Sequence, residues 1–325
     1  MQRLFAIGEI LIDFIPQQKG KALKDVVSFE RAPGGAPANV AAAVAKLGGN
    51  SYLISKLGED AFGDFLIEQL QEAGVNVDKV LRTSEANTGL AFVSLREDGE
   101  RDFSFYRNPS SDLLLTEDEI DDSWFQEGDI LHFCSVDLVE SPMKQAHRKT
   151  IASMKEKGGL ISFDPNVRLS LWHSKEACRK TILEFIPLAH LVKISDEELS
   201  FITGIEQEEK AIQSLFVGDV QVVVYTKGPD GASVYTKNAA YYLGGYKVNV
   251  QDTTGAGDAW IGGFLYQLLE KKITQHTMEL GLQAHANEIL AFANASGAIT
   301  TTGKGAISSL PMKEEICAFM KERIE

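Results

Sequence analysis

The 325-residue sequence has little of what a nucleic-acid-binding or membrane protein needs. It holds 32 Lys and Arg residues against 46 Asp and Glu residues, a net charge of −14, and has no extended basic run. This acid excess disfavours nucleic acids and anionic membrane surfaces as partners. No apolar run approaches the roughly 18 residues that a transmembrane helix requires. The length instead suits two domains, or one large α/β domain with an insertion.

Cysteine is scarce, and the few cysteines are far apart: Cys134, Cys178 and Cys317. An odd number at such spacing excludes a disulfide framework and a CxxC metal site. We therefore expect reduced thiols and a cytoplasmic protein. The apolar N-terminus, LFAIGEILIDFIP, is interrupted by two acidic residues and lacks a small-residue cleavage site. It predicts a buried strand over 4–12 in place of a signal peptide.

Several catalytic signatures are also missing. The segment from Gly297 to Lys304 has five residues between its glycines, and Gly305 stands where a Walker A loop needs Ser or Thr. No HExxH motif is present, and no GxGxxG follows the first predicted strand, which removes an NAD-binding Rossmann protein. A P-loop, a zincin site and a dinucleotide fold are therefore excluded.

Short apolar runs alternate with helical patterns along the chain. Strands are predicted over 4–12, 51–57, 160–163, 190–194 and 221–226, and helices over 37–47 and 61–73. This alternation predicts an α/β fold with three layers, a mostly parallel central sheet and helices on both faces.

Two stretches, 14–33 and 88–107, interrupt this alternation. The second reads as a hairpin with a turn at 97–100, because Asp-Gly between two alternating runs is a strong hairpin signal. In its second strand, Phe103, Phe105 and Arg107 share one face. We predict a small antiparallel β lid, inserted from about 14–33 and 88–107, in one large α/β domain spanning 1–325.

The most informative segment is DTTGAGD, residues 252–258, followed by an apolar helical pattern. The amides of Gly255, Ala256 and Gly257 would lie at the positive end of that helix and form an anion site. Asp258 beside such a site suits a general base that deprotonates a hydroxyl nucleophile. From the segment alone, a glycine-rich helix start with an N-terminal acid remains an equal alternative.

At this segment the sequence resembles the ribokinase-like (PfkB) carbohydrate kinases, and within them the fructokinases. DTTGAGD matches the signature DTxGAGD, and GGAPAN at 34–39 matches the N-terminal signature of a Gly-Gly pair followed by Asn. Further similar blocks are GEILIDFIP, FYRNPSSDLLL, DPNVRLSLW, KISDEEL and FANASGAITTTGKGA. They follow in order from residue 8 to 306.

The resemblance implies roles for individual residues on the sugar side. The residues that match sugar-binding or lid positions are Asp13, Gly34, Gly35, Asn39, Phe105, Arg107 and Arg168. Each role has an alternative without a ligand. Asp13 could cap a strand end, the glycines could form a plain turn, Phe105 could be a core aromatic, and the arginines could form surface ion pairs. Arg107 could instead be a dimer contact at a sheet edge.

On the nucleotide side, the resemblance implies ATP contacts by Ser195, Thr226, Gly228, Gly231 and Asn294. Glu198 matches the acidic residue of an N-x-x-E motif linked to Mg²⁺, although Ser195 replaces the Asn. Mg²⁺ keeps several waters, so Glu198 would act through water. Asp252 and Thr254, near Gly303, Gly305 and Ser309, match a monovalent-cation site for K⁺.

The implied reaction is phosphoryl transfer from MgATP to a sugar primary hydroxyl, with D-fructose giving fructose 6-phosphate. A 2-keto-3-deoxygluconate kinase is an alternative, because Arg107 and Arg168 could clamp a carboxylate. A non-catalytic sugar sensor on the same fold is a remote alternative. A homodimer through the lid sheet is the expected assembly.

Overall fold

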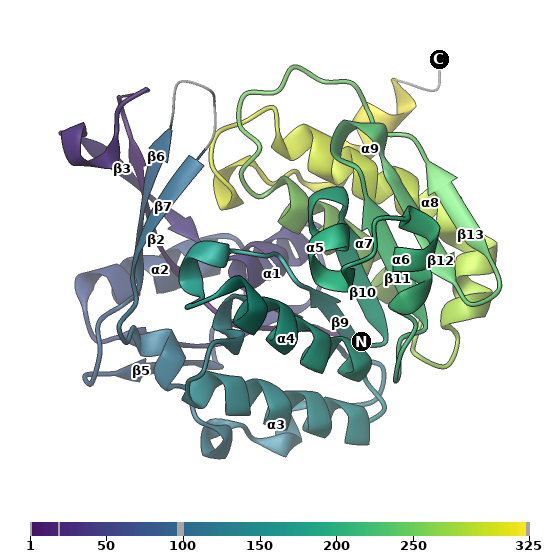
Figure 1. The fold of residues 1–325 in the computed structure, drawn as a ribbon, viewed down its shortest axis with the longest axis horizontal. Coiled ribbons are helices and arrows are strands. Elements are labelled where there is room, and N and C mark those ends of the chain that lie inside the picture. The colour runs from purple at the N-terminus through teal and green to yellow at the C-terminus, as the bar shows by residue number, and fades with distance from the viewer. Residues whose placement is uncertain (1, 19, 96–100, 323–325) are drawn as a thin grey trace.

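The computed structural model describes residues 2–18, 20–95 and 101–322, which form two separate sheets (Figure 1). The large sheet has the strand order β13-β12-β11-β10-β9-β8-β1-β4-β5. Its strands are β1 Leu4–Ile7, β4 Ser51–Gly58, β5 Val80–Thr83, β8 Ile130–Cys134, β9 Leu160–Asp164, β10 Leu191–Ser195, β11 Val222–Thr226, β12 Ala232–Thr236 and β13 Ala240–Leu243. The pairs from β5 to β11 are parallel, and the pairs β11–β12 and β12–β13 at one edge are antiparallel.

Helices cover both faces of this sheet, which confirms the predicted three layers. One face packs against α3 Pro142–Glu156, α4 Lys175–Phe185, α5 Asp196–Thr203 and α6 Glu208–Ser214. The other face packs against α1 Ala36–Lys46, α2 Ala61–Glu72, α7 Ala256–Glu270, α8 Met278–Thr300 and α9 Lys313–Lys321. The strands between these layers are buried on both sides, as parallel strands with crossover helices must be.

The small sheet confirms the predicted second sheet and projects from one end of the molecule (Figure 1). It consists of β3 Phe29–Gly34, β2 Leu11–Pro16, β6 Leu90–Leu95 and β7 Arg101–Tyr106, in that order. Its outer pairs are antiparallel, but the central pair β2–β6 is parallel because the two strands come from separate excursions of the chain. The predicted turn at 97–100 and the side chain of Phe103 lie outside the described residues.

The prediction of one continuous strand over 4–12 is wrong in one respect. The chain divides it into β1 in the large sheet and β2 in the small one. The break lies at Gly8, which has φ 147°, and a Cβ there would approach Pro37 Cγ to 2.5 Å. An apolar run cannot by itself show that its two halves belong to different sheets.

Within residues 2–18, 20–95 and 101–322, no helix has the length and apolar character needed to cross a bilayer. The three cysteines are free thiols, two of them buried.

Candidate active site

A cavity of about 310 Å³ lies where β1, β8, β9 and β10 end, beneath the small sheet. Its wall combines carboxylates, amides, two basic side chains and the first turns of α1 and α7. The lining residues are Glu9, Leu11, Asp13, Gly35, Ala36, Asn39, Phe105, Val136, Asn166, Arg168, Leu171, Lys193, Thr253, Thr254, Gly255, Gly257 and Asp258. Ligands of open parallel sheets bind at the carboxyl ends of the strands, as this cavity would allow.

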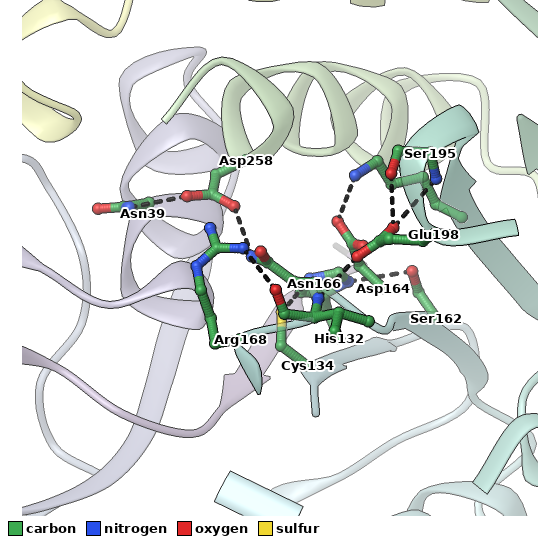
Figure 2. A network of polar contacts seen from close by, with 12 residues as sticks. Asn39, His132, Cys134, Ser162, Asp164, Asn166, Arg168, Ser195, Glu198 and Asp258 are labelled. Carbon is green, nitrogen blue, oxygen red and sulfur yellow. Dashed lines mark hydrogen bonds and ion pairs between the residues drawn. The ribbon is translucent and has the colours of Figure 1, made fainter. Parts of the chain in front are cut away.

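Asp258 stands in the first turn of α7 and points into this cavity (Figure 2). Asn39 Nδ2 donates to Asp258 Oδ2 at 2.8 Å, and Asn166 Nδ2 donates to Oδ1 at 3.4 Å. Burial raises the pKa of Asp258 to about 6, and the charge of Asp164 adds to the rise, although the Asn39 hydrogen bond opposes it. A carboxylate with this pKa is ionised near neutral pH and basic enough to accept a hydroxyl proton.

Of the three residues predicted to form an anion site at the start of α7, two line the cavity. Gly255 and Gly257 line the cavity, and Gly255 has φ 75°, a left-handed conformation that favours glycine. A Cβ on Gly255 would approach Ala306 Cβ to 2.7 Å. The amide of Ala256 instead donates to Thr253 O at 3.2 Å, so it holds the turn together.

The predicted sugar-side residues gather opposite Asp258. Asp13, Gly35 and Asn39 line the cavity, and Gly34 lies directly behind Asp13. A Cβ on Gly34 would come within 2.1 Å of Asp13 Oδ2, so only glycine admits this carboxylate. Gly35, with φ 112°, lies close to the backbone of Glu9, because a Cβ on Gly35 would be 2.4 Å from Glu9 O.

Arg168 and Phe105 also line the cavity, as expected. Arg107 differs from its expected place, because it is not among the lining residues. Its side chain is 3% exposed, and its guanidinium forms ion pairs with Asp112 and Asp137. Two nearby carboxylates thus hold the side chain away from the cavity.

A buried ion pair that the sequence reasoning missed lies on the cavity floor. Lys193 Nζ contacts Asp164 Oδ2 at 2.7 Å, and Lys193 lines the cavity close to Gly257. Burial lowers the pKa of Lys193, but the attraction of Asp164 and Glu198 outweighs it and leaves the pKa above its ordinary value. The floor therefore holds a permanent positive charge beside the start of α7.

Asn166 and Glu9 were also missed. Asn166 belongs to the loop after β9 and has φ 45°, an unusual value for a residue other than glycine, which aims its amide at Asp258. Glu9 is buried, and its Oε1 accepts a hydrogen bond from Ala36 N at 3.0 Å. Both residues belong to sequence blocks that carry the family resemblance, GEILIDFIP and DPNVRLSLW, but the spacing of residues in a block does not show which side chains face a cavity.

The predicted nucleotide residues lie outside this cavity. Thr226 ends β11, and Gly228 and Gly231 flank the turn that follows, with φ 48° and 98°. Asn294 is buried, where it accepts from Trp260 Nε1 at 2.7 Å and donates to Leu243 O and Gly244 O. In this structure its side chain therefore joins α8 to α7 and to the end of β13.

Ser195 and Glu198 form a capping box at the start of α5, shown at the right of Figure 2. Glu198 Oε2 accepts from Ser195 N and Oγ at 3.0 and 2.9 Å, and Oε1 accepts from Val167 N at 2.6 Å. The described residues contain no group of three or more acidic, His or Cys side chains suited to a metal ion. An Mg²⁺ held by phosphates and water fits this arrangement, whereas a dedicated protein cage does not.

The residues predicted for the cation site form hydrogen bonds that join two loops. Asp252 Oδ1 accepts from Thr254 N and Oγ1 at 2.9 and 2.7 Å, and Oδ2 accepts from Gly305 N at 3.0 Å. A Cβ on Gly303 would approach Ser309 Oγ to 2.4 Å. These contacts join the loop before α7 to the loop after α8.

Comparison with known proteins gives a consistent result. The family model for pfkB family carbohydrate kinases matches residues 1–313. The chain is 42% identical to the probable fructokinase-4 of Arabidopsis thaliana over 319 residues, which cover 98% of this chain and 96% of that protein.

Solved structures are similar over the whole chain as well. A fructokinase from Xylella fastidiosa with bound ATP has a TM-score of 0.90 and 34% identity, with both chains fully covered. A fructokinase double mutant from Vibrio cholerae O395, in a form with fructose, ADP and potassium ion bound, has a TM-score of 0.87 and 37% identity, with 98% of each chain covered. The match over almost the whole chain shows that this protein belongs to the PfkB family of carbohydrate kinases and is a sugar kinase.

Proposed function

We propose that this sugar kinase transfers a phosphoryl group from MgATP to the primary hydroxyl of D-fructose and forms fructose 6-phosphate. The observation that carries the proposal is the buried Asp258 carboxylate, held by Asn39 at the positive end of α7. Fructokinases among the relatives and among the similar solved structures support fructose as the sugar.

In the proposed reaction, Asp258 accepts the proton of the sugar hydroxyl as its oxygen attacks the γ-phosphorus of ATP. The bond between this phosphorus and the bridging oxygen breaks, and ADP leaves with the electron pair. The amides at Gly255 and Gly257, together with Lys193, stabilise the negative charge that spreads over the transferring group. Asp13 and Asn39 orient the sugar, and Phe105 closes over it from the lid sheet.

The nucleotide is proposed to lie beside Thr226, Gly228 and Gly231, with its phosphates directed toward α7. Asn294 would shape the adenine side through the β13 carbonyls that it holds, and Ser195 would act through the start of α5. Mg²⁺ would neutralise charge on the phosphates when bound, with Glu198 reaching it through water. Asp252 and Thr254 would place the loop carbonyls around K⁺.

Fructose is favoured over 2-keto-3-deoxygluconate by the position of Arg107. The carboxylate clamp considered above would use Arg107 together with Arg168. Arg168 lines the cavity, but ion pairs with Asp112 and Asp137 engage the guanidinium of Arg107, so the clamp lacks one of its two arginines. A non-catalytic sugar sensor is disfavoured because Asp258 and the glycines before it are all present.

The whole chain is proposed to act as one kinase domain with the small sheet as its lid. Tyr106, in β7 of the lid sheet, is 64% exposed, and Val27, just before β3 of the same sheet, is 82% exposed. A second copy packed against this sheet would bury such side chains. A homodimer through this sheet is therefore proposed. The free thiols suit a cytoplasmic location.

The decisive experiment measures ADP release with fructose, 2-keto-3-deoxygluconate, ribose and a nucleoside, each with and without Mg²⁺. We expect the highest kcat/KM for fructose and a requirement for Mg²⁺. A higher kcat/KM for any other acceptor would reassign the substrate, and sugar binding without ADP release would favour the sensor. Size-exclusion chromatography with light scattering, repeated with Tyr106→Asp, tests the dimer.

A further inference from the structure

A buried cluster of one arginine and three carboxylates lies behind the cavity wall, where the lid sheet joins the large sheet. Arg107 follows the last strand of the lid, and Asp112 belongs to the short helix η2, Ser111–Leu114. Asp137 lies in η5, Val136–Leu138, directly after β8, and Glu9 lies between β1 and β2. All four side chains are at least nine-tenths buried.

Two of the carboxylates bind the guanidinium directly. Arg107 Nη2 donates to Asp112 Oδ2 and to Asp137 Oδ1, and Nε donates to Ser110 Oγ at 3.3 Å. Ser110 in turn donates to Asp112 Oδ1 at 2.5 Å. Withdrawing the arginine would leave two buried carboxylates unpaired, which is strongly unfavourable.

Glu9 is the third carboxylate, and it separates this cluster from the cavity. Glu9 lines the cavity, as do Phe105, two residues before Arg107, and Val136, the neighbour of Asp137. Its Oε2 has no hydrogen-bond partner among the residues that the structure describes. Burial and the charge of Asp137 raise the pKa of Glu9 well above its ordinary value, although Arg107 opposes this rise.

The positive charge of Arg107 and the acidic side chains that face the cavity therefore lie on opposite sides of the wall at Glu9. Arg107 is enclosed, whereas the acidic side chains of Glu9, Asp13 and Asp258 face the cavity. Two basic side chains also line the cavity, but Lys193 is already paired with Asp164, and Arg168 stands on the loop after β9. A sugar carboxylate placed at this wall would lose its water and meet carboxyl groups in place of a guanidinium. An uncharged sugar offers hydroxyls, which carboxyl groups bind well.

We propose that Asp112 and Asp137 are specificity-determining residues, which retain Arg107 behind the wall and so restrict the kinase to uncharged sugars. The inference rests on the proposed function and adds the structural basis of its selectivity against sugar acids. Removing both charges would leave Glu9 as the nearest carboxylate, and its unpartnered Oε2 would draw the guanidinium toward the cavity.

The test compares kcat/KM for fructose with kcat/KM for 2-keto-3-deoxygluconate in the full chain. The wild type should favour fructose by at least about 100-fold, since a carboxylate at the Glu9 wall would be desolvated with no cation beside it there. The isosteric Asp112→Asn/Asp137→Asn variant should lower this ratio by about tenfold or more, mainly through a lower KM for the acid. Adding Arg107→Met should return the ratio toward the wild-type value.

Equal losses for both sugars in the double variant, with the ratio unchanged, would show a purely structural cluster and overturn the proposal. A wild type that phosphorylates the acid as well as the neutral sugar would overturn it too, even if the variants fail to fold. If the wild type phosphorylates another neutral sugar but not fructose, the proposed substrate fails. The selectivity is then tested with that sugar and its acid.

Discussion

Asn39 donates a hydrogen bond of 2.8 Å to Asp258 across 219 residues of the chain. It joins the first turn of α1, which directly follows Gly34 and Gly35, to the first turn of α7, which carries Asp258, the proposed base (Figure 2). Two helix starts that are far apart in sequence thus form one site. This bond also opposes the effect of burial on the pKa of Asp258.

Replacing Asp258 with Asn is expected to lower kcat for fructose by about 10²–10⁴, which is the usual value of general-base catalysis. Fructose and ATP should still bind, as measured by calorimetry, because the side chain keeps its shape. Turnover close to that of the wild type would remove Asp258 from the role of base.

The same variant is expected to be more stable than the wild type at pH 8. The folded pKa of Asp258 is raised from 3.8 to about 6, so the fold favours the neutral form and loses stability as the pH rises through this range. A rise of this size corresponds to up to about 3 kcal/mol. Thermal unfolding should show a higher Tm for Asp258→Asn at pH 8 and a smaller difference at pH 4. The exposed Asp25→Asn is the control and should show neither effect.

The pH profile of kcat/KM should fall on the acid side with a midpoint near 6, because protonated Asp258 cannot accept the hydroxyl proton. The residual activity of Asp258→Asn should lack this limb. A wild-type profile that is flat between pH 5 and 7 would contradict the assignment.

Asn39→Ala should move the acid limb to higher pH, because it removes the hydrogen bond that lowers the pKa of Asp258. It should also raise the KM for fructose, while the KM for ATP changes little. Asn166→Ala, which removes a longer contact of 3.4 Å, is the matched comparison and should shift the limb less. A limb that stays in place in Asn39→Ala would show that this hydrogen bond does not tune the base.

Gly34→Ala should raise the KM for fructose by about tenfold or more, because the added Cβ would displace the Asp13 carboxylate, 2.1 Å away. Gly244→Ala is the control, since its Cβ would meet its nearest neighbour at 3.7 Å. Initial rates over a range of fructose concentrations measure the effect, and equal KM values in the two variants would rule out the proposed contact.

Potassium should raise the rate relative to sodium and to a large organic cation at the same ionic strength. Asp252→Ala should reduce this difference, because the carboxylate holds the loop at Thr254 and Gly305 together. Rates that are equal in all three cations would remove the proposed cation site.

The sequence by itself determined the local features of this protein. Alternating apolar runs predicted the layers, and the segment before α7 predicted a base beside an anion site, because glycine conformation and helix capping depend on adjacent residues. Only the tertiary structure decided which charges meet. Lys193 pairs with Asp164 over 29 residues, and Arg107 with Asp137 over 30, and no spacing rule relates such pairs. Likewise, only the tertiary structure shows that Pro37, at the start of α1, leaves no room for a side chain at Gly8, where the first predicted strand breaks.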